Sequence, residues 1–112
     1  MADEPNPIAT EVIFEDDKVR VWNQVVPAGA DIKKHEHLND YFLINVSGTG
    51  PIAVEFHDGT GGDFVENFVF EPKLCSADFI RKGHIDTAHN QGDEHREILC
   101  ELKCWIKTRV DV

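Results

Sequence analysis

Apolar residues recur at every second position along much of this chain, and this period-2 pattern constrains the fold more than any other feature. Val19, Val21 and Val25 alternate with polar residues, and the stretch from Ile52 to Phe56 repeats the pattern. Successive side chains of a β-strand point to opposite faces, so such alternation is typical of strands with one buried face. No segment shows the 3.6-residue repeat of an amphipathic helix, and we expect about eight to ten strands with almost no helix.

Turn residues separate these segments at near-even spacing. Pro27-Ala28-Gly29 and Gly48-Thr49-Gly50 each end a strand, and Asp58 to Asp63 is the clearest hairpin signal. Many short strands joined by short turns favour a sandwich, a jelly roll or a small barrel. We therefore predict an all-β fold in which 1–112 is a single domain and residues 1–7 are a Pro-containing arm.

The charge of the chain excludes some classes of function. It has 21 acidic and 11 basic side chains, which gives a formal net charge of −10. A surface of this sign repels phosphate backbones and anionic lipids, so we expect binding to neither nucleic acids nor membranes. No apolar run approaches the roughly 18 residues of a membrane span, and the polar N-terminus is unlike a signal peptide, so a cytoplasmic protein is expected.

The three cysteines agree with a reducing compartment. Cys75 lies in the middle of the chain. In an extended strand over 98–106, Cys100 and Cys104 share one face with Ile98, Leu102 and Ile106. The other face carries Glu97, Glu101 and Lys103, together with Leu99 and Trp105. We interpret the cysteines as buried apolar residues rather than as disulfide partners or zinc ligands.

His35 and His37 carry the strongest chemical signal. Alternate residues of a strand point the same way, so the two imidazoles should lie side by side. Such a pair suits a divalent metal: iron, manganese, nickel or zinc. In a second cluster, His84 and Asp86 would share a face if that segment is extended. The His-x-His tripeptide alone is equally compatible with two surface or core histidines, so its context matters.

That context resembles the cupin family. Gly29, the pair His35 and His37, and Gly48 match the first cupin motif, which is a glycine, five residues, His-x-His and a later glycine. The segment from Gly83 to Asn90 matches the second motif imperfectly. The resemblance implies a small antiparallel β-barrel, the double-stranded β-helix or jelly roll of RmlC-like proteins, with a metal inside the barrel.

Residues 14–103 also resemble a bacterial subgroup of small single-domain cupins. The shared features are Val19-Arg20-Val21-Trp22, Asp40-Tyr41, Asn90-Gln91-Gly92, and a final strand that begins Arg96-Glu97-Ile98-Leu99 and continues to Lys103. Such proteins commonly pair through their sheets and N-terminal strands. The resemblance therefore implies a homodimer, with the segment 8–14 as its edge strand.

The chain departs from the usual cupin ligands, which are three histidines and one glutamate. The glutamate position holds Tyr41 and the third histidine position holds Asp86. Asp86 could complete a two-histidine, one-carboxylate set with His35 and His37. A register shift could instead bring in His84 or His89, or no metal binds and the pocket is vestigial.

From these features we predict a metal-dependent enzyme that acts on a small molecule inside the barrel, as an oxygenase, an isomerase or a lyase. His35, His37 and Asp86 are the predicted ligands, with Tyr41 and His84 as proton donors or acceptors. The alternative is a small-molecule or metal-binding module without turnover. Trp22 is interpreted as a packing residue. The remaining histidines are interpreted as solvated polar residues: His57, His89 and His95.

Overall fold

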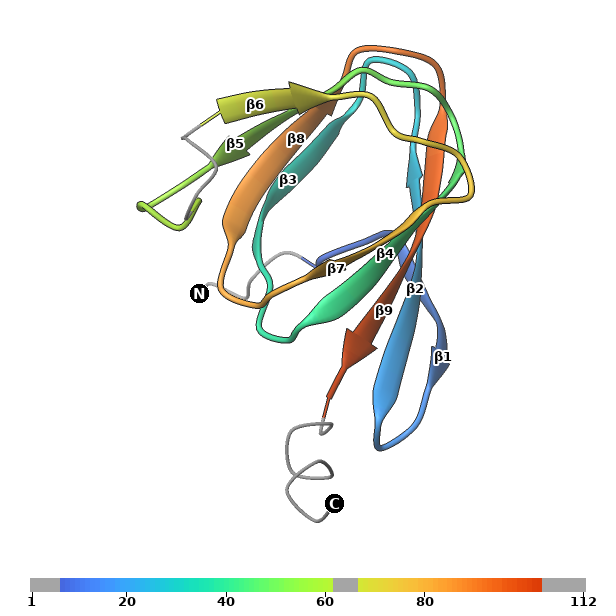
Figure 1. Cartoon of the computed structure of the whole chain (residues 1–112), viewed down its shortest axis with the longest axis vertical. Helices are drawn as coiled ribbons and strands as arrows, with labels where there is room; N and C mark the ends of the chain where they lie inside the picture. Colours follow the sequence, from blue (N-terminus) through green and yellow to red (C-terminus); the bar gives the residue numbers. More distant parts are fainter. Residues whose placement is uncertain (1–6, 62–66, 104–112) are drawn as a thin grey trace.

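Nine antiparallel strands form two sheets in the computed structural model, which describes residues 7–61 and 67–103 (Figure 1). The five-stranded sheet has the order β1-β2-β9-β4-β7, with β1 at Glu11–Glu15, β2 at Val19–Val26, β9 at His95–Leu102, β4 at Tyr41–Ser47 and β7 at Ala77–Ile80. The four-stranded sheet has the order β3-β8-β5-β6, with β3 at Asp31–Glu36, β8 at Ile85–Asn90, β5 at Ile52–Phe56 and β6 at Asn67–Phe70. No helix occurs within these ranges, so the prediction of an all-β fold is confirmed.

The two sheets face each other (Figure 1). Residues of both sheets line a cavity between them. A small apolar core closes part of this interior. It consists of Ile8, Ala9, Tyr41 and Leu99, against which Trp22, Leu43 and Ile80 pack. The segment before β1 thus contributes to the core of the barrel.

The pairing of β3 with β8 positions the predicted ligands. In this register His35 lies opposite Asp86, after a bulge between Ile32 and His35. The ladder continues beyond the end of β3, because the amide of His37 donates to the carbonyl of His84 at 2.9 Å and Gly83 donates to His37 at 2.8 Å. Both histidines therefore face the strand that carries Asp86.

Asn90 ties two turns together at one end of the barrel. Its side chain is 1% exposed, and its amide donates to the carbonyls of Val26 at 3.0 Å, Pro27 at 3.2 Å and Asp93 at 2.6 Å. Its side-chain oxygen accepts a hydrogen bond from the amide of Gly92. These bonds satisfy backbone groups at the turns after β2 and β8, which would otherwise be unpaired.

The last strand corrects the sequence prediction. β9 begins at His95, and its inward face carries His95, Glu97, Leu99 and Glu101, all of them buried. The face of Ile98, which was expected to be buried, is only half-buried. The polar face can point inward because its carboxylates are paired: Glu101 accepts hydrogen bonds from Trp22 at 2.6 Å and Asn39 at 3.1 Å, and Glu97 pairs with His95.

The cysteine prediction is also wrong in part. Cys75 is exposed, and Cys100 is half-buried; both are free thiols. Cys75 lies in the loop before β7, where a polar turn rather than a strand surrounds it, and Cys100 lies on the outer side of β9. Cys104, Trp105 and Ile106 lie outside the described residues.

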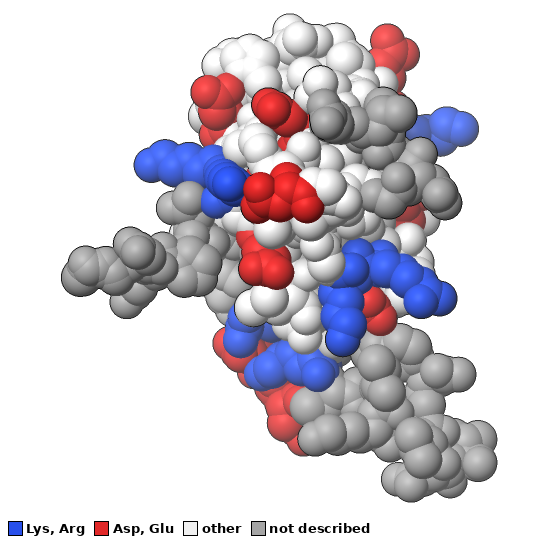
Figure 2. Space-filling model, turned by 90° about the vertical axis from the view of Figure 1, so that its left-hand side faces the viewer, with Lys and Arg blue, Asp and Glu red and all other residues white. Residues whose placement is uncertain are grey.

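The surface shows charges of both signs. Figure 2 shows one face of the molecule, on which the described acidic and basic side chains are interspersed among uncharged ones. Within residues 7–61 and 67–103, no helix is long and apolar enough to cross a membrane.

Candidate metal centre

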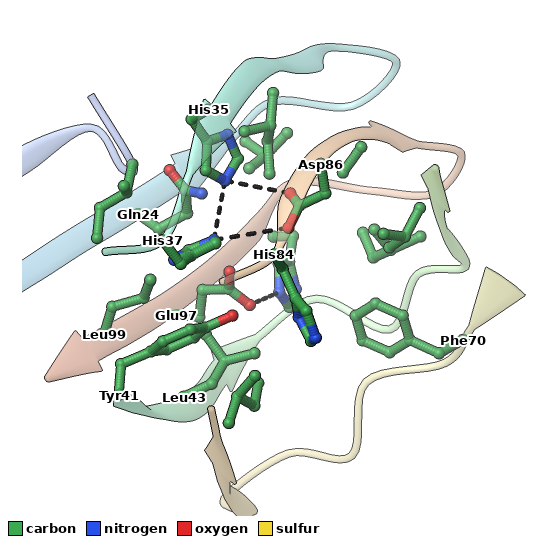
Figure 3. Close-up of a pocket in the computed structure, with 18 of the residues that line it drawn as sticks. Gln24, His35, His37, Tyr41, Leu43, Phe70, His84, Asp86, Glu97 and Leu99 are labelled. Atoms are coloured by element: carbon green, nitrogen blue, oxygen red, sulfur yellow. Dashed lines mark hydrogen bonds and ion pairs between the residues drawn. The ribbon is translucent and has the colours of Figure 1, made fainter. Parts of the chain in front are cut away.

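His35, His37 and Asp86 converge inside the barrel (Figure 3). Nε2 of His35 lies 3.0 Å from Nε2 of His37 and 3.1 Å from Oδ1 of Asp86, and Nε2 of His37 lies 3.6 Å from Oδ2 of Asp86. The two imidazoles are buried, and the Asp86 side chain is 13% exposed. The three residues thus present a compact set of nitrogen and oxygen atoms to one point.

These separations fit a divalent metal. Ligand atoms bonded at about 2.1 Å lie about 3.0 Å apart at right angles and about 3.4 Å apart in a tetrahedron. The 3.0 Å between the two imidazole nitrogens and the 3.1 Å from His35 to Oδ1 of Asp86 are close to the first value, and His37 lies 3.6 Å from the other carboxylate oxygen, Oδ2. Two imidazoles and one carboxylate also form the facial triad of non-haem iron enzymes. The donor set and its spacing therefore suit the metals predicted from the sequence.

A hydrogen bond of His35 Nδ1 fixes the ring so that Nε2 faces the cluster. Nδ1 of His35 lies 2.6 Å from the carbonyl of Lys33, so Nδ1 carries the proton. Burial opposes protonation of Nε2, but the hydrogen bond and charge of Asp86, with the Lys33 carbonyl, outweigh it and raise the pKa of His35. Lone pairs of His35 and Asp86 face each other, and a proton or a metal cation must lie between them.

His37 offers an uncharged imidazole. Burial is the main cause that lowers the pKa of His37 to about 4; the nearby His35 and His84 lower it further, against the carboxylate of Asp86. The ring is therefore uncharged at neutral pH. Its Nδ1 is buried without a hydrogen-bond partner among the described residues, and its orientation comes from stacking on Tyr41, with ring centroids 4.4 Å apart.

Tyr41 holds its phenol against this cluster. It begins β4, is 5% exposed and lines the cavity. Burial raises the pKa of Tyr41 far above its usual range, and the carboxylates of Asp86 and Glu97 act in the same direction. The phenol therefore stays protonated, and it can donate a hydrogen bond or a proton but cannot serve as a base near neutral pH.

We expect the folded protein to show no tyrosinate absorbance when the pH rises past 10, where an unfolded tyrosine ionises. Tyr41 is the only tyrosine of the chain, so the signal near 295 nm reports this residue alone. Because only the unfolded chain ionises in this range, the free energy of unfolding should fall as the pH rises above about 10. A spectrophotometric titration, with a urea-unfolded sample as control, checks both; ionisation near pH 10 in the folded protein would contradict the burial argument.

The alternative ligands differ in position. His84 lines the same cavity, where its ring lies edge-on to Phe56 with centroids 5.0 Å apart, but it is outside the converging set. His89 is exposed on the outer side of the barrel, where it pairs with Asp31. The geometry thus favours Asp86 over the other two as the residue that completes the cluster, and it keeps His84 near enough to act in the cavity.

Sequence reasoning missed two polar residues of the cavity. His95 was predicted to be solvated, but it is 2% exposed, and its Nε2 lies 2.8 Å from Oε2 of Glu97, which is 7% exposed. Both line the cavity, as does Gln24. Residues 95 and 97 are two apart, as are His35 and His37, so the same alternation rule could have placed them on one face. His57 is half-buried and contacts Oγ1 of Thr87 at 3.0 Å.

The cavity around these groups is small and mostly apolar. Its volume is about 160 Å³, and aliphatic and aromatic side chains form most of its wall: Val26, Ile32, Leu43, Ile52, Val54, Phe56, Phe68, Phe70, Ile80 and Leu99. Pockets for drug-sized ligands usually measure about 300–1,000 Å³. The site therefore suits a ligand of only a few carbon atoms.

Two facing antiparallel sheets around a histidine-lined cavity define a double-stranded β-helix. Solved structures show the same arrangement. A cupin domain from Bordetella pertussis matches with a TM-score of 0.72 and 20% sequence identity, over 92% of this chain and 99% of that one. An RmlC-like cupin family protein from Methanocaldococcus jannaschii matches with a TM-score of 0.63 and 15% identity, over 88% and 83%. The protein therefore has the cupin fold.

A protein with a double-stranded β-helix domain from Klebsiella pneumoniae is also similar, with a TM-score of 0.60 and 20% identity over 92% of this chain and 82% of that one. No family model matches the sequence. No curated protein matches it either. The fold thus supports the resemblance to cupins inferred from the sequence motifs.

Proposed function

We propose that this protein is a metal-dependent cupin enzyme that acts on a small molecule inside the barrel. The observation that carries this proposal is the convergence of two imidazole nitrogens and a carboxylate within 4.8 Å of one another, with the two nitrogens 3.0 Å apart and a carboxylate oxygen 3.1 Å from one of them. Iron, manganese, nickel and zinc all suit this donor set. Three protein ligands leave coordination positions open for a substrate.

A divalent ion in such a site supplies Lewis-acid or redox chemistry, which suits an oxygenase, an isomerase or a lyase. The residues of the chain supply the rest. His35, His37 and Asp86 would hold the ion. Tyr41, which stays protonated, would donate a proton or a hydrogen bond to an oxygen of the substrate. His84, which lines the same cavity, would accept or donate a second proton, and most of the surrounding wall is apolar.

The alternative is a module that binds a small molecule or a metal without turnover. The small, apolar cavity favours this function as much as catalysis, because it can enclose a ligand without any reaction. Metal analysis of protein purified without a His-tag or a chelating column tests the proposal. We expect one equivalent of a transition metal, and a metal-free protein that takes up none of the four ions would contradict the enzyme proposal.

We also propose a two-fold homodimer that pairs through β1. This strand is at the edge of the five-stranded sheet, and its apolar residues are exposed: Val12 is 44%, Ile13 54% and Phe14 54% exposed. An open apolar edge strand is a liability that a second copy removes.

Light scattering should therefore give a dimer mass at micromolar concentration, and Phe14→Asp should shift the protein toward the monomer because it places a charge in the apolar contact. Val69→Asp is the matched control, since Val69 is 59% exposed on β6 in the other sheet and should leave the dimer intact. A wild-type monomer would refute the proposal.

A further inference from the structure

Two polar side chains of the five-stranded sheet line the cavity without belonging to the metal cluster. Tyr41 begins β4, and Glu97 lies on β9, which pairs with β4. Both are buried, and Figure 3 shows them among the residues around the cavity. Burial is the main cause that raises the pKa of Tyr41, and the carboxylates of Asp86 and Glu97 add to it, so both carboxylates lie near the phenol. A donor and an acceptor thus border the same space.

The phenol of Tyr41 is a hydrogen-bond donor without a partner in the described part of the chain. Stacking on His37 holds its ring, which is 5% exposed, but its oxygen bonds to no residue of 7–61 or 67–103. A buried donor is unfavourable when it is left unpaired. Since this phenol stays protonated, an acceptor atom of a ligand, such as a carbonyl oxygen, would satisfy it.

Glu97 presents an acceptor to the cavity. Its Oε2 lies 2.8 Å from Nε2 of His95, and this hydrogen bond fixes the orientation of the carboxylate. Its other oxygen, Oε1, makes no hydrogen bond to a residue of the described ranges. A carboxylate that is oriented through one oxygen can accept a proton at the other, which is the arrangement of a general base.

The rest of the lining limits the class of ligand. No Lys or Arg of the described residues lines the cavity, so no such side chain there would balance an anion, and Glu97 needs no cation because His95 is already its partner. The volume of about 160 Å³ and the largely aliphatic and aromatic wall restrict the ligand to a few carbon atoms. These properties fit a short uncharged molecule with an acceptor oxygen.

We propose that the cavity binds a short uncharged carbonyl compound and catalyses its enolisation. Tyr41 donates a hydrogen bond to the carbonyl oxygen, and Glu97 is the base that removes a proton from the carbon next to the carbonyl. This inference rests on the proposed function in placing a reaction in this cavity, and it deepens that proposal by naming a substrate class and a proton transfer.

The step needs no oxidant or reductant. The C–H bond beside the carbonyl breaks, and its proton goes to Oε1 of Glu97. The electron pair of that bond forms a carbon–carbon double bond, and the carbonyl π electrons move to the oxygen. Tyr41 stabilises the negative charge that develops on this oxygen. Return of a proton from Glu97 to carbon completes an exchange or an isomerisation and regenerates the carboxylate.

Deuterium exchange into 2-butanone tests the proposal, followed by proton NMR in D₂O near neutral pD. We expect the protein to accelerate exchange at the carbons next to the carbonyl. Glu97→Gln keeps the shape of the side chain but removes the base, so the protein-catalysed rate should fall on the order of a hundredfold or more. Glu94→Gln is the matched control, because Glu94 is exposed just before β9, and it should leave the rate unchanged.

Tyr41→Phe decides the matter should Glu97→Gln not fold. It removes only the phenol oxygen, which has no hydrogen bond to lose within the described residues, so Tm should stay near that of the wild type. The exchange rate should fall about tenfold or more, because the donor to the developing negative charge is gone. An unchanged rate in Tyr41→Phe, or a wild-type rate no higher than that of buffer alone, would overturn the enolisation.

Metal content is measured on the same samples, so the two proposals fail separately. A protein that takes up no metal but catalyses exchange through Glu97 would contradict the metal-dependent enzyme and support the enolisation. A protein that holds one equivalent of metal but does not accelerate exchange would overturn the enolisation and leave the metal proposal standing.

Discussion

Replacing Asp86 with Asn is expected to lower metal affinity on the order of a hundredfold or more while the fold survives. The substitution removes the anionic oxygen that lies 3.1 Å from Nε2 of His35, and it nearly preserves the volume of the side chain. An amide is a weaker ligand than a carboxylate and leaves the charge of a divalent ion less compensated. Competition with a chelator of known affinity measures the loss, and thermal unfolding reports the fold.

Three variants make this test specific. Asp31→Asn is the matched control, because Asp31 also pairs with a histidine, His89, but on the outer surface of the barrel, and it should leave metal binding unchanged. Asp86→His should retain metal, since it restores the usual three-histidine set of cupins. His84→Ala should do much less harm than Asp86→Asn. The reverse ranking would show that His84 rather than Asp86 is the third ligand.

Gly92→Ala is expected to destabilise the fold by about 3 kcal/mol or more, which corresponds to a fall in Tm of about 10 °C or more. A Cβ at this position would lie 1.9 Å from the carbonyl oxygen of Gly50, so two backbone segments would have to separate. The turn could not keep its other bonds if it moved, because Asn90 accepts from Gly92 and the amide of Gln91 donates to the carbonyl of Pro51 at 2.9 Å. Denaturation by heat and by urea measures the change.

Gly29→Ala is the control for this substitution. Gly29 has a φ of +76°, but an added Cβ would meet no atom within 4 Å. An alanine there pays only the cost of the left-handed backbone, which is about 1–2 kcal/mol. Comparable losses of stability at the two glycines would contradict the close approach of Gly92 to Gly50.

Local rules explain which parts of the fold the sequence could predict. Alternation from Val19 to Val25 and from Ile52 to Phe56 correctly predicted β2 and β5, because the two-residue period of a strand is a property of the backbone. The glycines after Asp58 gave a hairpin turn, and the structure has positive φ at Asp58 and Gly59 there. The spacing of His35 and His37 placed both rings on one side for the same reason.

Asp86 shows how far the site could be predicted. The motif resemblance placed it at the third histidine position, but the choice among Asp86, His84 and His89 stayed open because register was unknown. The pairing of His35 with Asp86 across β3 and β8 depends on a bulge between Ile32 and His35, which the sequence does not signal. A shift by one residue would turn every side chain of the strand to the other face.

The sequence by itself determined that this chain forms strands and that His35 and His37 point the same way. Only the tertiary structure decided which face of β9 is inside, and so made Glu97 and His95 part of the cavity. Alternation tells which residues share a face, but both faces of β9 carry polar and apolar residues, so hydrophobicity does not choose between them. The choice depends on partners far along the chain: Trp22 and Asn39 satisfy Glu101, and such long-range pairing permits a buried polar face.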